Sequence, residues 1–188
     1  MGNLIYHMMI SLDGYMETLD HSLDWHAVDE ELHVFINDLE RTVAMYLLGR
    51  RSYQLMEEYW PNAHLDPANP PYMADYAHIW RNMPKVVFSR TLEQVGMNAR
   101  LVRENIFEEV ARLKAETPGD ISIGGAETAV PFIERGLVDE YRIFISPIVL
   151  GNGIPAFRPH EQRANLRLLN SRVFSNGVVY LQYVKREE

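Results

Sequence analysis

The stretch VAMYLLGRRS at residues 43–52 carries the clearest indication of how this chain folds. Its apolar part, residues 43–48, is short and uninterrupted, which is typical of a strand buried on both faces of a sheet. Gly49 ends the strand and permits a tight turn. A helix is expected from Ser52, acting as its cap, to Trp60. The stretch therefore predicts a strand, a turn and a helix in direct succession.

Similar units recur on both sides of this stretch. Strands are expected at residues 4–10, 85–89, 101–102, 120–123 and 140–146, and helices at 29–42, 72–82, 105–116 and 128–135, with loops at 61–71 and 151–159. Near the C-terminus, Ser175-Asn176-Gly177 separates strand-like segments at 166–174 and 178–184, a strong hairpin signal. This order predicts a single α/β domain over residues 1–188. We expect a three-layer α/β/α fold whose mostly parallel mixed sheet ends in an antiparallel C-terminal hairpin.

The composition argues against several classes of function. The chain has no cysteine, which removes disulfides, thiolate metal sites and cysteine nucleophiles. A net charge of −8 and scattered basic residues argue against a nucleic-acid partner. The longest apolar runs, such as residues 143–150, fall short of the ~20 residues that a bilayer requires. No signal peptide is evident, so we expect a cytoplasmic protein without membrane contact.

Ligand-binding residues are expected where strands end, because open α/β sheets bind ligands beyond the carboxyl ends of their strands. Gly49 and the pair Gly124 and Gly125 would let the backbone approach a phosphate at a helix start, where N–H groups and the helix dipole favour anions. Arg51 and its neighbour Arg50 would add charge-assisted hydrogen bonds. Each of these motifs also has an ordinary explanation as a tight turn or a solvated arginine. The segments concerned are residues 11–15, 49–52, 89–91 and 124–128.

The motifs together resemble a known family. They are SLDGY at residues 11–15, LGRRSY at 48–53, KVVFSRT at 85–91, IGGA at 123–126, GLVDE at 136–140 and PIVLGNG at 147–153. In this order they resemble the reductase domain of the riboflavin-biosynthesis deaminase–reductase and, more broadly, the dihydrofolate-reductase-like superfamily. The resemblance covers nearly the whole chain. No deaminase zinc motif precedes it, so the chain resembles a stand-alone reductase domain.

The resemblance implies an NADPH-dependent enzyme that transfers a hydride to a pterin-like or ribosylamino-pyrimidine substrate, with chemistry that the cofactor carries. The implied cofactor-binding residues are Gly49, Arg50, Arg51, Ser52, Ser89, Arg90, Thr91, Gly124, Gly125, Ala126 and Glu127, with Ser89 and Arg90 beside the adenosine 2′-phosphate. The implied substrate-binding residues are Ser11, Asp13, Tyr15, Trp25, Ser146 and Pro147. Relatives of this type often pair, so we expect a homodimer. The alternatives are a non-catalytic module of the same fold that binds NADP or another ligand, and an α/β domain that binds no dinucleotide.

The source of a proton remains open. Dihydrofolate reductases carry an acid on the first helix a few residues after a tryptophan, and here Trp25 is followed by Asp29 and Glu30. Either acid, or a water molecule, would supply the proton. Alternatively, both acids only interact with the positive end of the helix dipole. Because His26, Glu30 and His33 have i, i+4, i+7 spacing, they could also share a face as metal ligands. No further ligand pattern supports this, and we expect no metal.

Overall fold

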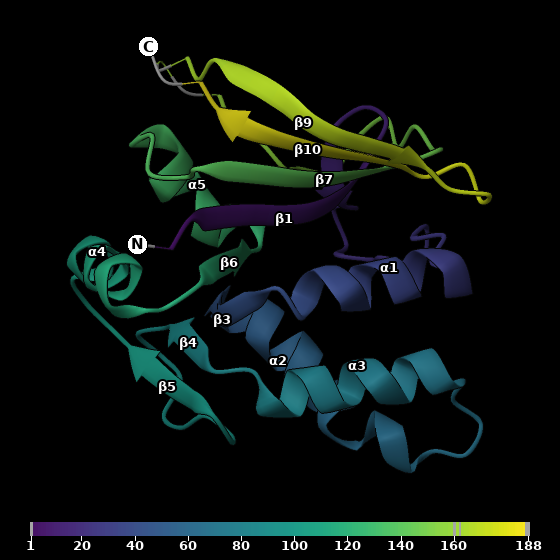
Figure 1. Ribbon diagram of the computed structural model, residues 1–188, viewed down its shortest axis with the longest axis horizontal. Coiled ribbons are helices and arrows are strands. Elements are labelled where there is room, and N and C mark those ends of the chain that lie inside the picture. The colour runs from purple at the N-terminus through teal and green to yellow at the C-terminus, as the bar shows by residue number, and fades with distance from the viewer. Residues whose placement is uncertain (1, 160, 162, 187–188) are drawn as a thin grey trace.

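A sheet of eight strands forms the middle layer of the molecule (Figure 1). The computed structural model describes residues 2–159, 161 and 163–186. The strands of this sheet are β1 (Leu4–Ser11), β3 (Val43–Gly49), β4 (Lys85–Phe88), β5 (Ala99–Val102), β6 (Asp120–Gly124), β7 (Glu140–Ser146), β9 (Leu166–Val173) and β10 (Val179–Lys185). Their order is β5-β4-β3-β6-β1-β7-β10-β9. The strands from β5 to β7 run parallel, and β10 and β9 form an antiparallel hairpin at one edge.

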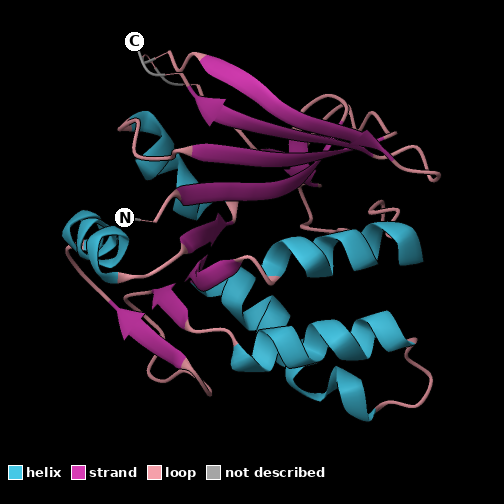
Figure 2. Cartoon of the chain, viewed as in Figure 1, coloured by secondary structure: helices cyan, strands magenta, loops and turns pink. Residues whose placement is uncertain are grey.

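Helices cover both faces of the sheet (Figure 2). The elements are α1 (Glu30–Glu40), α2 (Arg50–Tyr59), the 3-10 helix η1 (Trp60–Leu65), α3 (Pro71–Asn82), α4 (Ile106–Glu116) and α5 (Ala126–Glu134). Side chains of β1 alternate between the two faces, because Leu4 and Tyr6 pack with α4 and α5 whereas Ile5 packs with α2 and α3. Such burial on both faces explains the nearly continuous apolar runs in the central strands. No helix in the described ranges is both long and apolar enough to cross a membrane.

The structure confirms the three-layer α/β fold, the mostly parallel sheet and the C-terminal hairpin. Two predictions about the turn at residue 49 and the following loop are wrong in detail. Helix α2 begins at Arg50 with Gly49 as its N-cap, so Ser52 lies inside the first turn and does not cap the helix. The region expected to be loop after Trp60 contains η1, which begins with a proline near its first position, where no N–H is needed.

A second, small sheet lies in two regions where the sequence predicts no strand, one of them the loop expected at residues 151–159. Strand β2 (Tyr15–Glu17) pairs antiparallel with β8 (Ile154–Pro155). Strands of two or three residues are too short to show an alternating pattern, which is why the sequence gives no sign of them. This small sheet joins the segment after β1 to the loop after β7, beside the carboxyl ends of the central strands.

Candidate functional site

Two helix starts lie side by side at the carboxyl edge of the sheet. Helix α2 starts after Gly49 and α5 after Gly125, and both follow strands that are parallel neighbours, β3 and β6. A Cβ atom on Gly49 would collide with Oγ1 of Thr128, and one on Gly125 would lie 2.7 Å from Oγ of Ser52. Gly125 also has a φ of +83°, which side chains rarely adopt. Glycine is therefore required at both turns for the two helix starts to approach this closely.

The paired helix starts have the chemistry of an anion site. The first turns of α2 and α5 present backbone N–H groups without partners inside their own helix, and each helix dipole is positive at this end. The hydroxyl of Ser52 lies beside Gly125, and the hydroxyl of Thr128 lies beside Gly49. Such an arrangement can hold a group that carries two phosphates. Gly124 and Ala126, the other expected phosphate-binding residues of this turn, flank Gly125 directly.

The arginines of the first turn of α2 differ in their surroundings. Arg50 is exposed. Arg51 donates a hydrogen bond from Nη2 to Oε2 of Glu17 at 2.9 Å, and its Nη1 lies 3.5 Å from Oε1 of the same carboxylate. The side chain of Glu17 is buried, and its Oε2 also lies 3.0 Å from Nδ1 of His21. Arg51 therefore joins the expected phosphate-binding turn to strand β2.

The residues expected beside a 2′-phosphate follow β4. Ser89 is buried, and its Oγ accepts hydrogen bonds from the backbone N–H groups of Thr91 at 3.2 Å and Leu92 at 3.0 Å. Ser89 thus holds the shape of the turn, while Arg90 and Thr91 are exposed on it. Glu127, the remaining expected cofactor residue, is exposed in the first turn of α5 and pairs with Arg158 at 3.3 Å.

On the substrate side, Asp13 joins two loops. Its Oδ1 accepts a hydrogen bond from the hydroxyl of Ser11 at 2.6 Å and from N–H of Leu150 at 3.1 Å, and its Oδ2 accepts one from N–H of Gly151 at 2.7 Å. These bonds, with that from Ser11 contributing most, lower the pKa of Asp13 below its ordinary value. Ser11 also accepts a hydrogen bond from N–H of Tyr15, the first residue of β2. The segment after β1 and the loop after β7 are consequently held together.

Several buried polar atoms in the segment between β2 and α1 and at the end of β7 lack partners among the described residues. They are Oγ of Ser146, Nε1 of Trp25 and Nε2 of His26. Ser146 is fully buried at the end of β7, and Pro147 after it lies against the hairpin turn at Gly177. Burial lowers the pKa of His26 to about 4, so its ring is neutral at pH 7. Since buried polar atoms are normally hydrogen-bonded, these three can serve a polar ligand. Substrate contact is a prediction from the sequence for Trp25 and Ser146, and the sequence gives no such prediction for His26.

The two candidate acids occupy different environments at the start of α1. Asp29 is the N-cap, and its Oδ1 accepts a hydrogen bond from N–H of Leu32 at 2.9 Å. Glu30 is the exposed first residue of the helix. Because α1 begins at Glu30, His26 lies outside the helix, and the metal-binding face that requires a continuous helix through His26 and His33 does not form. The ring of His33 instead contacts Oδ1 of Asn37 at 3.1 Å.

Comparison with known proteins places this geometry in a family. The family model for the RibD C-terminal domain matches residues 3–180. This chain belongs to the RibD C-terminal domain family. The uncharacterized protein YyaP of Bacillus subtilis (strain 168) is 36% identical over 181 residues, covering 96% of this chain and 93% of YyaP.

Solved structures agree with this RibD C-terminal domain in fold. A pyrimidine reductase-like protein from Corynebacterium diphtheriae superposes with a TM-score of 0.71 at 14% identity, covering 100% of this chain and 93% of that one. Dihydrofolate reductase from Enterococcus faecalis, complexed with NADP(H) and RAB-propyl, superposes with a TM-score of 0.66 at 15% identity, covering 99% and 98%. The expected family and the dihydrofolate-reductase-like fold are therefore confirmed. Both are a family and a fold of reductase-type enzymes.

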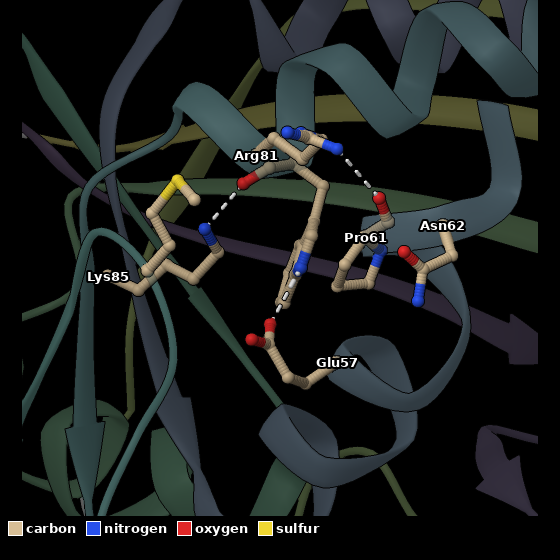
Figure 3. A pocket seen from close by; sticks show the side chains of 7 residues that line it. Glu57, Pro61, Asn62, Arg81 and Lys85 are labelled. Atoms are coloured by element: carbon tan, nitrogen blue, oxygen red, sulfur yellow. Dashed lines mark hydrogen bonds between the residues drawn. The ribbon is translucent and has the colours of Figure 1, made fainter. Parts of the chain in front are cut away.

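This chain also has a hollow at the amino end of β4, away from the two helix starts, with a volume of about 200 Å³ (Figure 3). It is lined by Glu57, Pro61, Asn62, Trp80, Arg81, Lys85 and Met97. Burial lowers the pKa of Lys85 to about 8, and its Nζ donates to the carbonyl oxygens of Trp80 and Met83 at the end of α3. Glu57 accepts a hydrogen bond from Nε1 of Trp80 at 2.9 Å. These buried polar groups satisfy one another, so their arrangement stabilises the junction of α3 and β4.

Proposed function

We propose that this RibD C-terminal domain is an NADPH-dependent reductase that transfers a hydride to a flat, polar heterocycle of the pterin-like or ribosylamino-pyrimidine class. The observation that carries the proposal is the close approach of the two helix starts at Gly49 and Gly125, in a chain that belongs to a reductase-type family. The E. faecalis dihydrofolate reductase of the same fold was solved with NADP(H). An acidic chain that nevertheless collects two helix starts and arginines at one edge is suited to an anionic cofactor.

The residues at the helix starts fit the phosphates of such a cofactor. Gly49, Gly125 and Ala126 leave room for the pyrophosphate, while Ser52 and Arg51 offer it hydrogen bonds. Arg90 and Thr91, exposed after β4, are assigned to the 2′-phosphate. When bound, NADPH supplies the hydride, so the chain needs no nucleophile of its own. The work of the protein is to hold the two rings close together and to exclude water.

The substrate would lie where the unpartnered polar atoms are buried. The ring of Trp25 offers a surface for stacking as well as its N–H group, and Oγ of Ser146 offers a second hydrogen-bonding group. His26, neutral at pH 7, can donate or accept a hydrogen bond without adding charge. Asp29 is engaged in capping α1, which favours Glu30 or a water molecule as the source of the proton.

The proposal is tested by titrating the protein with NADPH and following energy transfer from tryptophan to the nicotinamide. Arg51→Ala and Arg90→Ala should each weaken binding, whereas Arg112→Ala, at an exposed arginine on α4, should leave it unchanged. Absence of binding at high micromolar NADPH would rule out the proposed cofactor. A panel that includes dihydrofolate and the ribosylamino-pyrimidine then tests for NADPH oxidation. Binding without oxidation of NADPH by any substrate would instead favour a non-catalytic binding module.

We also propose that the chain forms a homodimer through β9. All eight residues of this edge strand are exposed, and they include Leu166, Leu168, Leu169 and Val173. An exposed edge with apolar side chains is prone to pair with another strand, and pairing of β9 with its own copy is self-complementary. Light scattering after size exclusion should report a dimer that Leu168→Lys dissociates. Leu65→Lys, at an exposed leucine of η1, is the matched control. A monomeric wild-type protein would contradict this assignment.

A further inference from the structure

Consecutive residues of β2 contact both of the proposed phosphate-binding turns. Sδ of Met16 accepts a hydrogen bond from the backbone N–H of Ala126 at 3.3 Å, at the start of α5. The carboxylate of Glu17 accepts the hydrogen bond from Arg51 at 2.9 Å, at the start of α2. A soft acceptor therefore lies on one helix start and a negative charge on the arginine of the other. The N–H group of Ala126 and the guanidinium of Arg51 lie in the turns that the proposed function assigns to cofactor phosphates.

The charge of Glu17 makes its carboxylate and a cofactor phosphate compete for Arg51. Glu17 is 7% exposed, so its carboxylate is poorly screened by water. A phosphate that reached Arg51 would lie close to this carboxylate, and two negative charges at such short range repel each other. The guanidinium also has only five N–H donors, of which Glu17 engages one at 2.9 Å and lies near a second. A phosphate can form all of its hydrogen bonds to the guanidinium of Arg51 only if Glu17 moves away.

The short strands and the glycines beside them allow a small movement of β2, although Met16 packs against the core. Among the residues that the structure describes, β2 pairs with the two-residue strand β8 alone, in a sheet separate from the central one. Gly14 and Gly151 lie next to these short strands, with φ values of +88° and +74°, and a Cβ on either would meet no atom within 4 Å. Asp13 joins the loops that contain these two glycines, which lets β2 and β8 move together.

We propose that β2 acts as an internal competitor for the cofactor, with Glu17 on Arg51 and Met16 on Ala126 occupying the positions that phosphates take when β2 withdraws. Glu17 is thereby a residue that sets cofactor affinity without contacting the reacting atoms. Cofactor binding also displaces the segment that leads from Ser11 toward Trp25, so occupancy of the cofactor site is coupled to the position of the proposed substrate loop. This inference rests on the proposed NADPH site.

The test is the affinity of Glu17→Gln for NADPH. The amide keeps the shape of the side chain and removes its charge, so the dissociation constant should fall about three- to fivefold, the effect of a partly exposed ion pair. Because Glu17 is buried, raising the salt concentration should shrink this difference only slightly. Glu116→Gln, which also removes a carboxylate paired with an arginine but on α4, should leave the affinity unchanged. Met16→Leu frees the N–H of Ala126 at nearly constant volume and should speed association.

Stopped-flow mixing provides a second measurement that does not depend on affinity. For the wild-type protein, the observed association rate should level off at high NADPH concentration because withdrawal of β2 becomes limiting, and Glu17→Gln should raise this plateau. If the wild-type protein binds NADPH as tightly as Glu17→Gln or more tightly, the inference is overturned and the proposed function stands. Failure of both proteins to bind NADPH would instead refute the proposed function, and the inference with it.

Discussion

The contact between the two helix starts makes Gly49→Ala a sharp test of the structure. Gly49 has an ordinary extended backbone, with φ −77° and ψ 165°, so alanine incurs no conformational strain there. The new Cβ would nevertheless lie closer than 3.0 Å to Oγ1 of Thr128, a separation that real Cβ atoms essentially never show. Thr128 is β-branched and lies in the first turn of α5, so its side chain has few rotamers through which to escape. The substitution must therefore force Thr128 into its other rotamer or push α2 and α5 apart.

The size of the effect follows from three contributions. Overpacking of a close contact costs about 1–3 kcal/mol. Alanine is also a poorer N-cap than glycine, by roughly 0.5 kcal/mol. The reduced freedom of the unfolded chain offsets roughly 0.4–1 kcal/mol of this cost. We expect a net loss of about 0.5–3 kcal/mol in the free energy of unfolding. For a chain of this size this corresponds to a fall in Tm of roughly 1–12 °C.

Urea denaturation of a double-mutant cycle separates the contact from the other contributions. Thr128→Ala removes Oγ1, and the Cβ of residue 128 would then lie 3.6 Å from the new Cβ, an ordinary contact. Gly49→Ala should accordingly cost at least about 1 kcal/mol less in the Thr128→Ala background, a coupling that adjacent residues can show. Additive effects of the two substitutions would refute the close approach of the helix starts. NADPH affinity should fall with Gly49→Ala and recover partly in the double variant.

Three further predictions concern single side chains. Asp29→Ala should lower the free energy of unfolding by about 1 kcal/mol through loss of the cap on α1. Asp29→Asn should retain both stability and substrate-dependent NADPH oxidation. Loss of oxidation in a stable Asp29→Asn protein would show that this acid donates the proton. His26 has a pKa lowered from 6.5 to about 4 by burial, so protonation favours the unfolded state, and the free energy of unfolding should fall by up to about 3 kcal/mol as the pH drops from 6.5 to 4. His26→Leu should flatten that part of the pH curve in urea titrations, and an unchanged curve would contradict the assignment. Arg90→Ala should weaken NADPH binding by on the order of tenfold, as expected for a charged hydrogen bond, and leave NADH binding unchanged, while equal losses for both cofactors would exclude contact with the 2′-phosphate.

The sequence was sufficient for the elements that have a local signature. The apolar run at residues 43–48, Gly49 after it, and the Asn176-Gly177 turn each predict their structure from a few neighbouring residues, and the structure contains a strand, a turn and a hairpin at these places. The positions of Gly49 and Gly125 next to a shared edge also followed from the rule that parallel strands end on the same side of a sheet. The boundaries were less certain, as Ser52 illustrates. Its side chain suits a cap, but the sharp transition from β3 into α2 assigns that place to Gly49.

Only the tertiary structure decided which groups occupy the candidate site. Glu17 and Arg51 are 34 residues apart, and nothing local to either indicates that they pair. Their contact depends on a strand order that places β1 and β3 on either side of β6, so that β2, which follows β1, lies beside the start of α2. The pairing of β2 with β8 and the collision that forbids a side chain at Gly49 arise from the same order. A sequence pattern reports how a residue is buried within its own element, whereas a contact between elements depends on how the whole sheet is assembled.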